Sequence, residues 1–209
     1  MKIIGTIKFR EMRKLTSLTI WSLFPFFLSG QIFLINPSFE GDEPQDAVVP
    51  AGWHACKMGT TPDILPGVWG VYNEPSEGET FVGLITRADG TWESIGQRLS
   101  SPVLPNECYA ITLDLAHSRT YAGYNQPIRL RIWGGTSKCA KNQLLAESKF
   151  IDHTDWETYS FQFVPKEPLY YLILEANFTD GSDFSHQGNI MIDNVRPIKT
   201  CIRAAKLKG

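Results

Sequence analysis

The sequence predicts an all-β protein built from two packed antiparallel sheets, and three observations support that class. Short runs of alternating apolar and polar residues recur along the chain, which is the pattern of half-buried strands. The 209 residues include 17 glycines and 13 prolines, many of them between these runs, which indicates many turns. Helical spacing is sustained almost nowhere after residue 30.

The strand candidates follow one another along the chain. Residues 81–86 and 94–99 are the first two, and 109–116 has the clearest alternation, with a tyrosine, an isoleucine and two leucines on one face. In 128–133, two isoleucines and a leucine alternate with two arginines and a tryptophan. The remaining candidates also place apolar residues on a shared face and are 159–163, 170–175 and 190–195. Residues 143–148 could form a single helical turn. About eight strands on roughly 175 residues predict a sandwich.

Residues 1–30 have the pattern of a secretory signal peptide. Five basic residues against one acid precede a mostly apolar run at 15–28, which ends in Leu28-Ser29-Gly30. The apolar run is shorter than the roughly 20 residues that span a bilayer, so a membrane anchor is the weaker interpretation. The start codon is either Met1 or Met12. We expect a secreted or cell-surface protein that begins near Gln31, with a sandwich over residues 31–200 and a basic tail over 201–209.

Charge and motifs exclude several classes of function. Residues 31–209 contain 15 basic and 21 acidic residues, and this net charge of −6 does not favour nucleic acid. The motifs Gly-x-Ser-x-Gly and His-Glu-x-x-His are absent, and so are the P-loop and dinucleotide fingerprints. Paired carboxylates can hydrolyse a glycoside, and Asp114 and Glu175 on predicted strands could converge. The alternative is that both are polar residues on a strand face. We therefore expect a protein that is not an enzyme.

Four cysteines follow the predicted cleavage site, and they are Cys56, Cys108, Cys139 and Cys201. An even number in an exported chain favours two disulfides, for which three pairings are possible. Metal binding is the other interpretation, but no Cys-x-x-Cys is present, so a zinc site is poorly supported.

Several short motifs resemble those of a known family. The chain begins with Asn-Pro-Ser-Phe-Glu at 36–40 and Gly-Trp at 52–53, and it closes with Ile-Asp-Asn-Val at 192–195. Residues 96–99 and 108–111 add a matching pair of central strands. In this order, the motifs resemble jelly-roll carbohydrate-binding modules with a galactose-binding-like fold. They also look like the amino-terminal modules of surface and gliding-associated proteins of Bacteroidetes-type bacteria.

The resemblance implies a structural calcium and a pairing of the cysteines. In that family the first and last strands often lie side by side and share a calcium, for which Glu40 and Asp193 would be the side-chain ligands. The alternative is that Glu40 caps a turn and Asp193 accepts hydrogen bonds from nearby backbone amides. The same layout places the strand at Cys108 beside the closing strand, which implies the disulfides Cys108–Cys201 and Cys56–Cys139.

Sugar binding requires flat apolar platforms and planar polar side chains. On the strand 128–133, Arg129, Arg131 and Trp133 point the same way, and two guanidinium groups beside an indole could bind a carboxylate-bearing or sulfated sugar. The alternative is a solvated sheet face on which arginine stacks on tryptophan.

The loop candidates flank glycine and proline turns, because loops often carry the function of a sandwich. They are Trp69, Tyr72, Arg87, Tyr121 and Tyr124. The alternative for each one is packing beneath a loop. We expect Trp53 and Trp156 to have a packing role.

The sequence thus predicts a secreted or surface-exposed, non-catalytic carbohydrate-binding module whose partner is a glycan or polysaccharide. One alternative is a structural or adhesive surface domain with a protein partner, which would expose an apolar patch. Another is a small glycan-active hydrolase.

Overall fold

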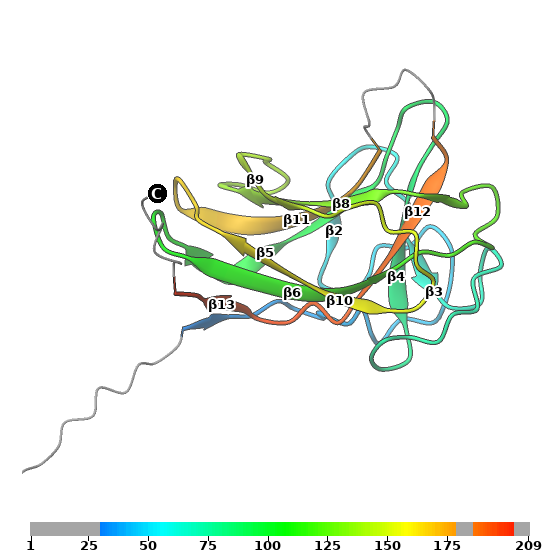
Figure 1. Cartoon of the computed structure of the whole chain (residues 1–209), viewed down its shortest axis with the longest axis horizontal. Coiled ribbons are helices and arrows are strands. Elements are labelled where there is room, and N and C mark those ends of the chain that lie inside the picture. Colours follow the sequence, from blue (N-terminus) through cyan, green and yellow to red (C-terminus); the bar gives the residue numbers. More distant parts are fainter. Residues whose placement is uncertain (1–29, 179–185, 203–209) are drawn as a thin grey trace, which may run out of the picture.

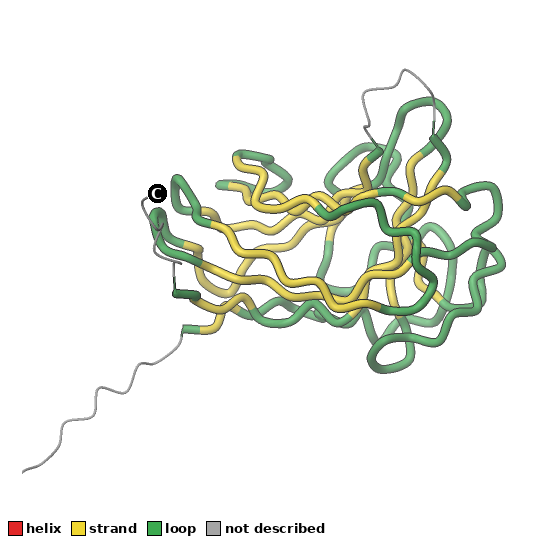
Figure 2. Tube along the Cα trace, in the orientation of Figure 1, coloured by secondary structure: helices red, strands yellow, loops and turns green. Residues whose placement is uncertain are grey.

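The computed structural model describes residues 30–178 and 186–202, and these form two stacked sheets (Figure 1). The predicted signal peptide up to residue 29 and the tail from residue 203 lie outside the described residues. Strands and long loops make up the described chain (Figure 2). None of these residues lies in a helix long and apolar enough to cross a bilayer.

The larger sheet, sheet A, joins the two ends of the described chain. Its main path runs through β1 (Gln31–Ile32), β13 (Ile198–Thr200), β6 (Tyr109–Ala116), β12 (Gly188–Asp193), β4 (Phe81–Thr86) and β3 (Asp63–Leu65). Two further strands join this path, β10 (Glu157–Phe163) beside β6 and β7 (Gln126–Pro127) beside β12. All pairings are antiparallel except the short β7–β12 pairing. The pairing of β1 with β13 confirms that the first and last strands lie side by side.

Sheet B is antiparallel and covers the other side of the core. Its order is β2 (His54–Ala55), β5 (Ser94–Val103), β11 (Leu169–Asn177), β8 (Arg129–Gly135) and β9 (Gln143–Glu147). The expected helical turn at 143–148 is wrong, because β9 pairs with β8 in antiparallel register. So short a segment makes few helical hydrogen bonds, whereas the neighbouring strand offers it a ladder.

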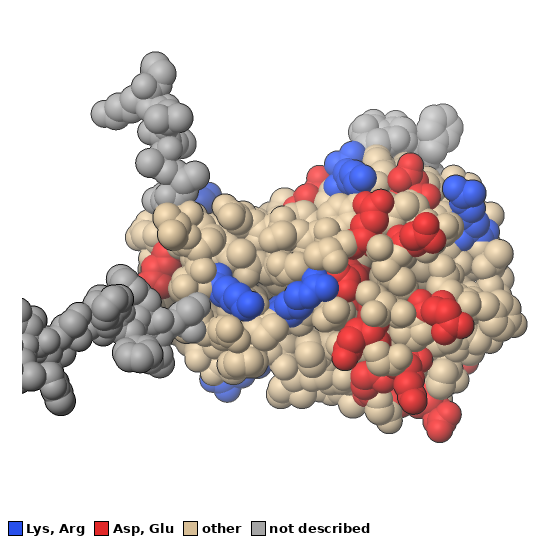
Figure 3. Space-filling model, turned by 60° about the horizontal axis from the view of Figure 1, so that its bottom comes forward, with Lys and Arg blue, Asp and Glu red and all other residues tan. Residues whose placement is uncertain are grey.

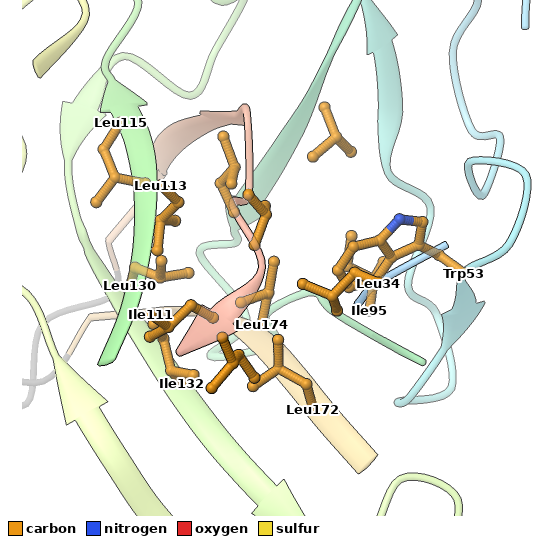
Figure 4. Close-up of a cluster of buried hydrophobic side chains, with 14 of the residues drawn as sticks. Leu34, Trp53, Ile95, Ile111, Leu113, Leu115, Leu130, Ile132, Leu172 and Leu174 are labelled. Atoms are coloured by element: carbon orange, nitrogen blue, oxygen red, sulfur yellow. The ribbon is translucent and has the colours of Figure 1, made fainter. Parts of the chain in front are cut away.

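The main core lies between the two sheets, as a sandwich requires. It collects alternate residues from strands of both sheets, and Figure 4 shows leucines and isoleucines of β6, β8 and β11 meeting there. Trp53 packs at the edge of this core, as expected, and its indole N–H donates to the Asn36 carbonyl at 3.0 Å. The fold class predicted from alternation is therefore confirmed.

Sheet A is also covered on its outer face, at the end that carries β3 and β4. Every residue of β4 and β12 is buried. Val82 and Leu84 belong to the main core, whereas Phe81 and Ile85 on the other side of β4 belong to a second apolar cluster. Because residues alternate along a strand, this second cluster lies outside the sandwich, under the loops 66–80 and 117–125. Trp156 packs edge-on against Phe81 there.

Both expected disulfides are present. Cys108–Cys201 closes a separation of 93 residues where β13 leaves β6, and the Cys201 N–H also donates to the Cys108 carbonyl. Cys56–Cys139 closes a separation of 83 residues and ties the segment after β2 to the loop between β8 and β9. Both bridges therefore join distant parts of the chain.

Removing the Cys108–Cys201 bridge should lower stability strongly, because the bridge restricts a long loop in the unfolded chain. We expect the double variant Cys108→Ser/Cys201→Ser to lose about 2–5 kcal/mol of unfolding free energy. Urea denaturation measures this loss, with Cys56→Ser/Cys139→Ser as the matched variant. An unchanged denaturation midpoint in both variants would contradict the prediction.

Candidate functional site

A pocket of about 410 Å³ opens beside the second apolar cluster. Its lining includes Asp63 of β3 and Ile85 of β4. These two strands lie at the end of the sandwich away from β13 (Figure 1). Four of the five loop candidates line it, and they are Trp69, Arg87, Tyr121 and Tyr124. The other lining residues are Asp46, Ala47, Thr61, Asp63, Ile85, Ala122, Gly123 and Gln187.

Tyr121 forms the floor of the pocket and is held from two sides. Its side chain is only 1% exposed, and its hydroxyl donates a hydrogen bond to Asp63. The ring lies close to β4 because position 83 is a glycine: a Cβ at Gly83 would come within 2.8 Å of the Tyr121 hydroxyl. A side chain at position 83 would therefore push Tyr121 out of place.

Asp63 is a buried carboxylate that connects three segments around the pocket. One oxygen accepts the Ala47 N–H at 2.9 Å, the other accepts the Tyr121 hydroxyl, and the Trp69 side chain is a third partner. Burial raises the pKa of Asp63 above its ordinary value, although these three donors oppose the shift.

Arg87 lines the pocket, and the buried carboxylate of Glu93 balances its positive charge. Its guanidinium group donates to Glu93 at 2.5 Å and to the Thr61 hydroxyl at 3.0 Å. Glu93 is fully buried and also accepts the backbone N–H groups of Thr61 and Ile85. Burial raises the pKa of Glu93, against the effect of these donors and of Arg87. Arg87 is thus fixed in place, and a buried carboxylate balances its charge.

Asn189 on β12 fixes the loop that carries Tyr121 and Tyr124. It is fully buried, and its side-chain amide donates to the carbonyls of Ser118 and Tyr124, both at 2.7 Å. Its side-chain oxygen accepts the Ser118 N–H at 2.9 Å. The two tyrosines are therefore held by a strand rather than by a free loop.

Trp69 is the exposed aromatic platform of the pocket. Its side chain is 46% exposed, and its backbone φ of +51° lies in the left-handed region that bulky residues rarely occupy. Hydrogen bonds from Ala122 N–H to the Trp69 carbonyl and from the Thr120 hydroxyl to the Gly70 carbonyl hold this conformation. Such conformations persist only where the surroundings enforce them, and they gather at functional sites.

Tyr72, the remaining loop candidate, lies outside the pocket. Its side chain is 75% exposed and belongs to the same loop as Trp69, but it is not among the residues that line the cavity. The structure therefore does not bring it together with the other four.

Arg129, Arg131 and Trp133 point outward from sheet B, because Leu130 and Ile132 between them belong to the core. Glu147 on β9 pairs with both arginines, with Arg129 at 3.0 Å and with Arg131 at 2.5 Å. Arg129 also lies over the ring of Phe150 at 4.3 Å. The Trp133 indole donates to Glu175 at 3.0 Å. The two guanidinium groups thus face a carboxylate of the protein itself.

The expectation that Asp114 and Glu175 could converge is wrong. Asp114 alternates with the core residues of β6 and points out of sheet A, where the Ser76 hydroxyl and Arg196 contact it. Glu175 alternates with the core residues of β11 and points out of sheet B. It accepts the indole N–H groups of Trp92 and Trp133 and pairs with Lys141. The two carboxylates face opposite sides of the molecule.

Glu40 and Asp193 meet the same loop, residues 76–80. Asp193 is fully buried and accepts the N–H groups of Ser76 and Glu77, both at 2.9 Å. Glu40 accepts the N–H groups of residues 79 and 80 at 3.0 Å. These are the hydrogen bonds expected if Glu40 caps a turn and Asp193 accepts backbone amides, with no calcium between them.

The same pair also has an unbalanced charge that a cation would neutralise. Burial raises the pKa of Asp193 to about 7, and the negative charge of Glu40 adds to the shift. Among the described residues, no lysine or arginine forms an ion pair with either carboxylate. Carboxylates and loop carbonyls are ligands that Ca²⁺ accepts, so the donor chemistry fits, and the calcium stays a prediction.

Sequence reasoning missed the acids and amides that complete the pocket. Asp46, Asp63 and Gln187 line it, whereas Glu93 and Asn189 hold its walls. The sequence carried one signal, an acid at position 63 within a short apolar run, where an unpaired charge is costly once it is buried. Which segments these residues join depends on the tertiary fold.

Comparison with known proteins identifies the fold. No family model and no curated protein matches the chain. The CBM22-1 xylan-binding domain of Xyn10C from Paenibacillus barcinonensis is 15% identical, with a TM-score of 0.52 over 84% of this chain and 97% of that domain. The K3 cleaved adhesin domain of the Lys-gingipain of Porphyromonas gingivalis is 13% identical, with a TM-score of 0.51 over 81% and 98%. An arabinose-bound α-L-arabinofuranosidase is 14% identical, with a TM-score of 0.53, over 82% of this chain and 27% of the enzyme. These likenesses confirm the jelly-roll fold implied by the motifs.

If Glu40 and Asp193 hold calcium, the ion should stabilise the fold. We expect 1 mM Ca²⁺, about a hundred times a dissociation constant near 10 µM, to raise the unfolding free energy by about 2–3 kcal/mol relative to EDTA. Differential scanning calorimetry measures this as a higher Tm, and Glu40→Gln should remove the difference. Equal Tm values in calcium and EDTA would show that the amide hydrogen bonds alone hold the loop.

The raised pKa of Asp193 predicts a pH dependence in EDTA. Its folded pKa of about 7 exceeds the ordinary 3.8, so the folded state binds the proton more tightly than the unfolded state does. The unfolding free energy should therefore rise as the pH falls from 7 toward 4, by at most about 1.4 kcal/mol per pH unit. Urea denaturation of Asp193→Asn is the control, because this variant should lose that contribution. An identical pH profile in both proteins would contradict the prediction.

Proposed function

We propose that this protein is a secreted or surface-exposed, non-catalytic carbohydrate-binding module whose glycan site is the pocket at Trp69. One observation carries the proposal: four residues selected from the sequence for sugar binding meet in one cavity of about 410 Å³. Pockets for small ligands commonly have this size, and they combine apolar walls with a few fixed polar groups.

The lining has the chemistry that a sugar ring needs. Trp69 offers an exposed indole for the C–H face of the ring, and Tyr124 adds a second aromatic group. Asp46, Thr61 and Gln187 offer side-chain oxygens and nitrogens for the hydroxyls. The buried hydrogen bonds of Asp63, Glu93 and Asn189 hold this lining in place, which reduces the entropy lost on binding.

The fold and the cysteines support the proposal. One similar structure is described as a xylan-binding domain and another as an adhesin domain, and the present chain has the same architecture. Because one fold hosts many functions, the pocket rather than the fold carries the assignment. Two disulfides fit an oxidising compartment, as the predicted signal peptide does.

A glycan microarray with the mature, disulfide-bonded protein tests the proposal. We expect a specific signal, and we expect Trp69→Ala to weaken binding of the best glycan about tenfold or more, because the variant removes the stacking platform. Tyr72→Ala is the matched control, since Tyr72 is an exposed aromatic residue of the same loop outside the pocket.

Two results would contradict the assignment. Equal losses in both variants would mean that the loop, and not the pocket, matters. A blank array from folded protein would favour a protein partner, which a pull-down with surface proteins would then identify.

A further inference from the structure

We infer that the pocket at Trp69 takes a sugar that carries a protonated amine, and that it rejects carboxylate-bearing and sulfated sugars. This inference rests on the proposed function and names the class of its ligand. It is argued from the charged residues that line the cavity, from the partners they already have and from their exposure.

The lining of the pocket has a negative balance. Asp46, Asp63 and Arg87 are its acidic and basic residues. The positive charge of Arg87 is already balanced by the buried Glu93 at 2.5 Å. An anionic ligand would have to compete with Glu93 for this guanidinium group, and it would face two carboxylates without a second cation among the lining residues.

Asp46 is the acid that can meet a ligand directly. It is exposed, and within the described chain no hydrogen bond or ion pair engages its carboxylate. Asp63, which also lines the pocket, is buried and already accepts the Tyr121 hydroxyl and the Ala47 N–H; burial raises its pKa, although these donors oppose the shift. An ammonium group beside Asp46 would gain the attraction of an exposed carboxylate that has no hydrogen-bond or ion-pair partner among the described residues to give up.

The aromatic residues of the pocket favour the same ligand. Trp69 and Tyr124 line the cavity together with Asp46 and Asp63. A cation near an indole or phenol ring gains electrostatic attraction from the ring face, and tryptophan is the strongest of these partners. An amino sugar presents both the C–H face that stacks and the cation that pairs.

The surrounding surface adds to this preference. On the face shown in Figure 3, Asp and Glu side chains gather on the half of the molecule that carries the loops at the β3 and β4 end, and they outnumber the Lys and Arg side chains there. This field repels anions and attracts cations at low ionic strength. The carboxylate-bearing or sulfated sugar expected at Arg129 and Arg131 is disfavoured as well, because Glu147 already pairs with both groups.

Isothermal titration calorimetry at pH 6 tests the inference with β-1,4-linked tetramers of glucosamine, N-acetylglucosamine and glucose, and with a galacturonate tetramer. These probes compare a cationic sugar with neutral and anionic ones. We expect the glucosamine tetramer to bind about tenfold more tightly than the two neutral tetramers, and the galacturonate tetramer to bind most weakly. The advantage of the glucosamine tetramer should shrink as salt is added.

Asp46→Asn should remove most of this advantage and weaken the binding of the neutral tetramers much less, because the amide still offers an oxygen and a nitrogen to their hydroxyls. Glu43→Gln is the matched control, because Glu43 is an exposed acid of the same segment outside this pocket. An equal effect of both variants would overturn the inference by showing a general attraction to an acidic protein.

Failure of the inference can be distinguished from failure of the proposed function. If neutral tetramers bind through Trp69 and the glucosamine tetramer gains nothing, the amine preference is wrong and the glycan site stands. If the galacturonate tetramer binds best, the charge argument is wrong. If no tetramer binds and the array is blank, both are wrong.

Discussion

The loops of this protein depend on buried carboxylates. Long loops cannot pair their backbone groups in a ladder, and buried polar groups must be satisfied in some other way. Asp63, Glu93 and Asp193 solve this problem, because each is buried and accepts hydrogen bonds from residues on different segments of the chain. Each carboxylate therefore satisfies two or more donors that no strand ladder reaches. Loss of one carboxylate would leave buried N–H or O–H donors unpaired and release the segments that it joins. Each of these acids therefore contributes to the stability of more than one loop.

The pocket follows from that arrangement. The loops 66–80 and 117–125 lie on the outer face of sheet A, so β4 and β12 are buried on both sides. Gly83 leaves room for Tyr121, and Asn189 holds the loop in place from β12. A cavity remains where the two loops meet the end of the sheet. The pocket is thus a by-product of covering a sheet face with irregular chain, and its walls are held by the strands below.

The sequence was sufficient to predict the longer strands, and the family resemblance implied the disulfide pairing. The short strands and the contacts between distant segments could not be predicted from it. Alternation predicted 109–116 as a strand because one side of β6 faces the main core. It failed at 143–148, where an edge strand gains its hydrogen bonds from β8. Trp69 and Tyr121 could be selected from their turn-rich surroundings. Asp63 could not, because its role depends on partners 16 and 58 residues away. Nor could alternation alone show that Asp114 and Glu175 point out of opposite sheets.

We propose that the ligand enters the pocket at Trp69 and does not bind to the outer face of sheet B. Indole N–H signals in a ¹⁵N correlation NMR spectrum separate the two, since Trp69 lines the pocket whereas Trp92 and Trp133 both donate to Glu175 on sheet B. The measurement is a titration with the best glycan from the array, after assignment by single tryptophan substitutions. We expect the Trp69 signal to move and those of Trp92 and Trp133 to stay in place. Movement of Trp92 and Trp133 with an unchanged Trp69 signal would contradict it and place the site on sheet B.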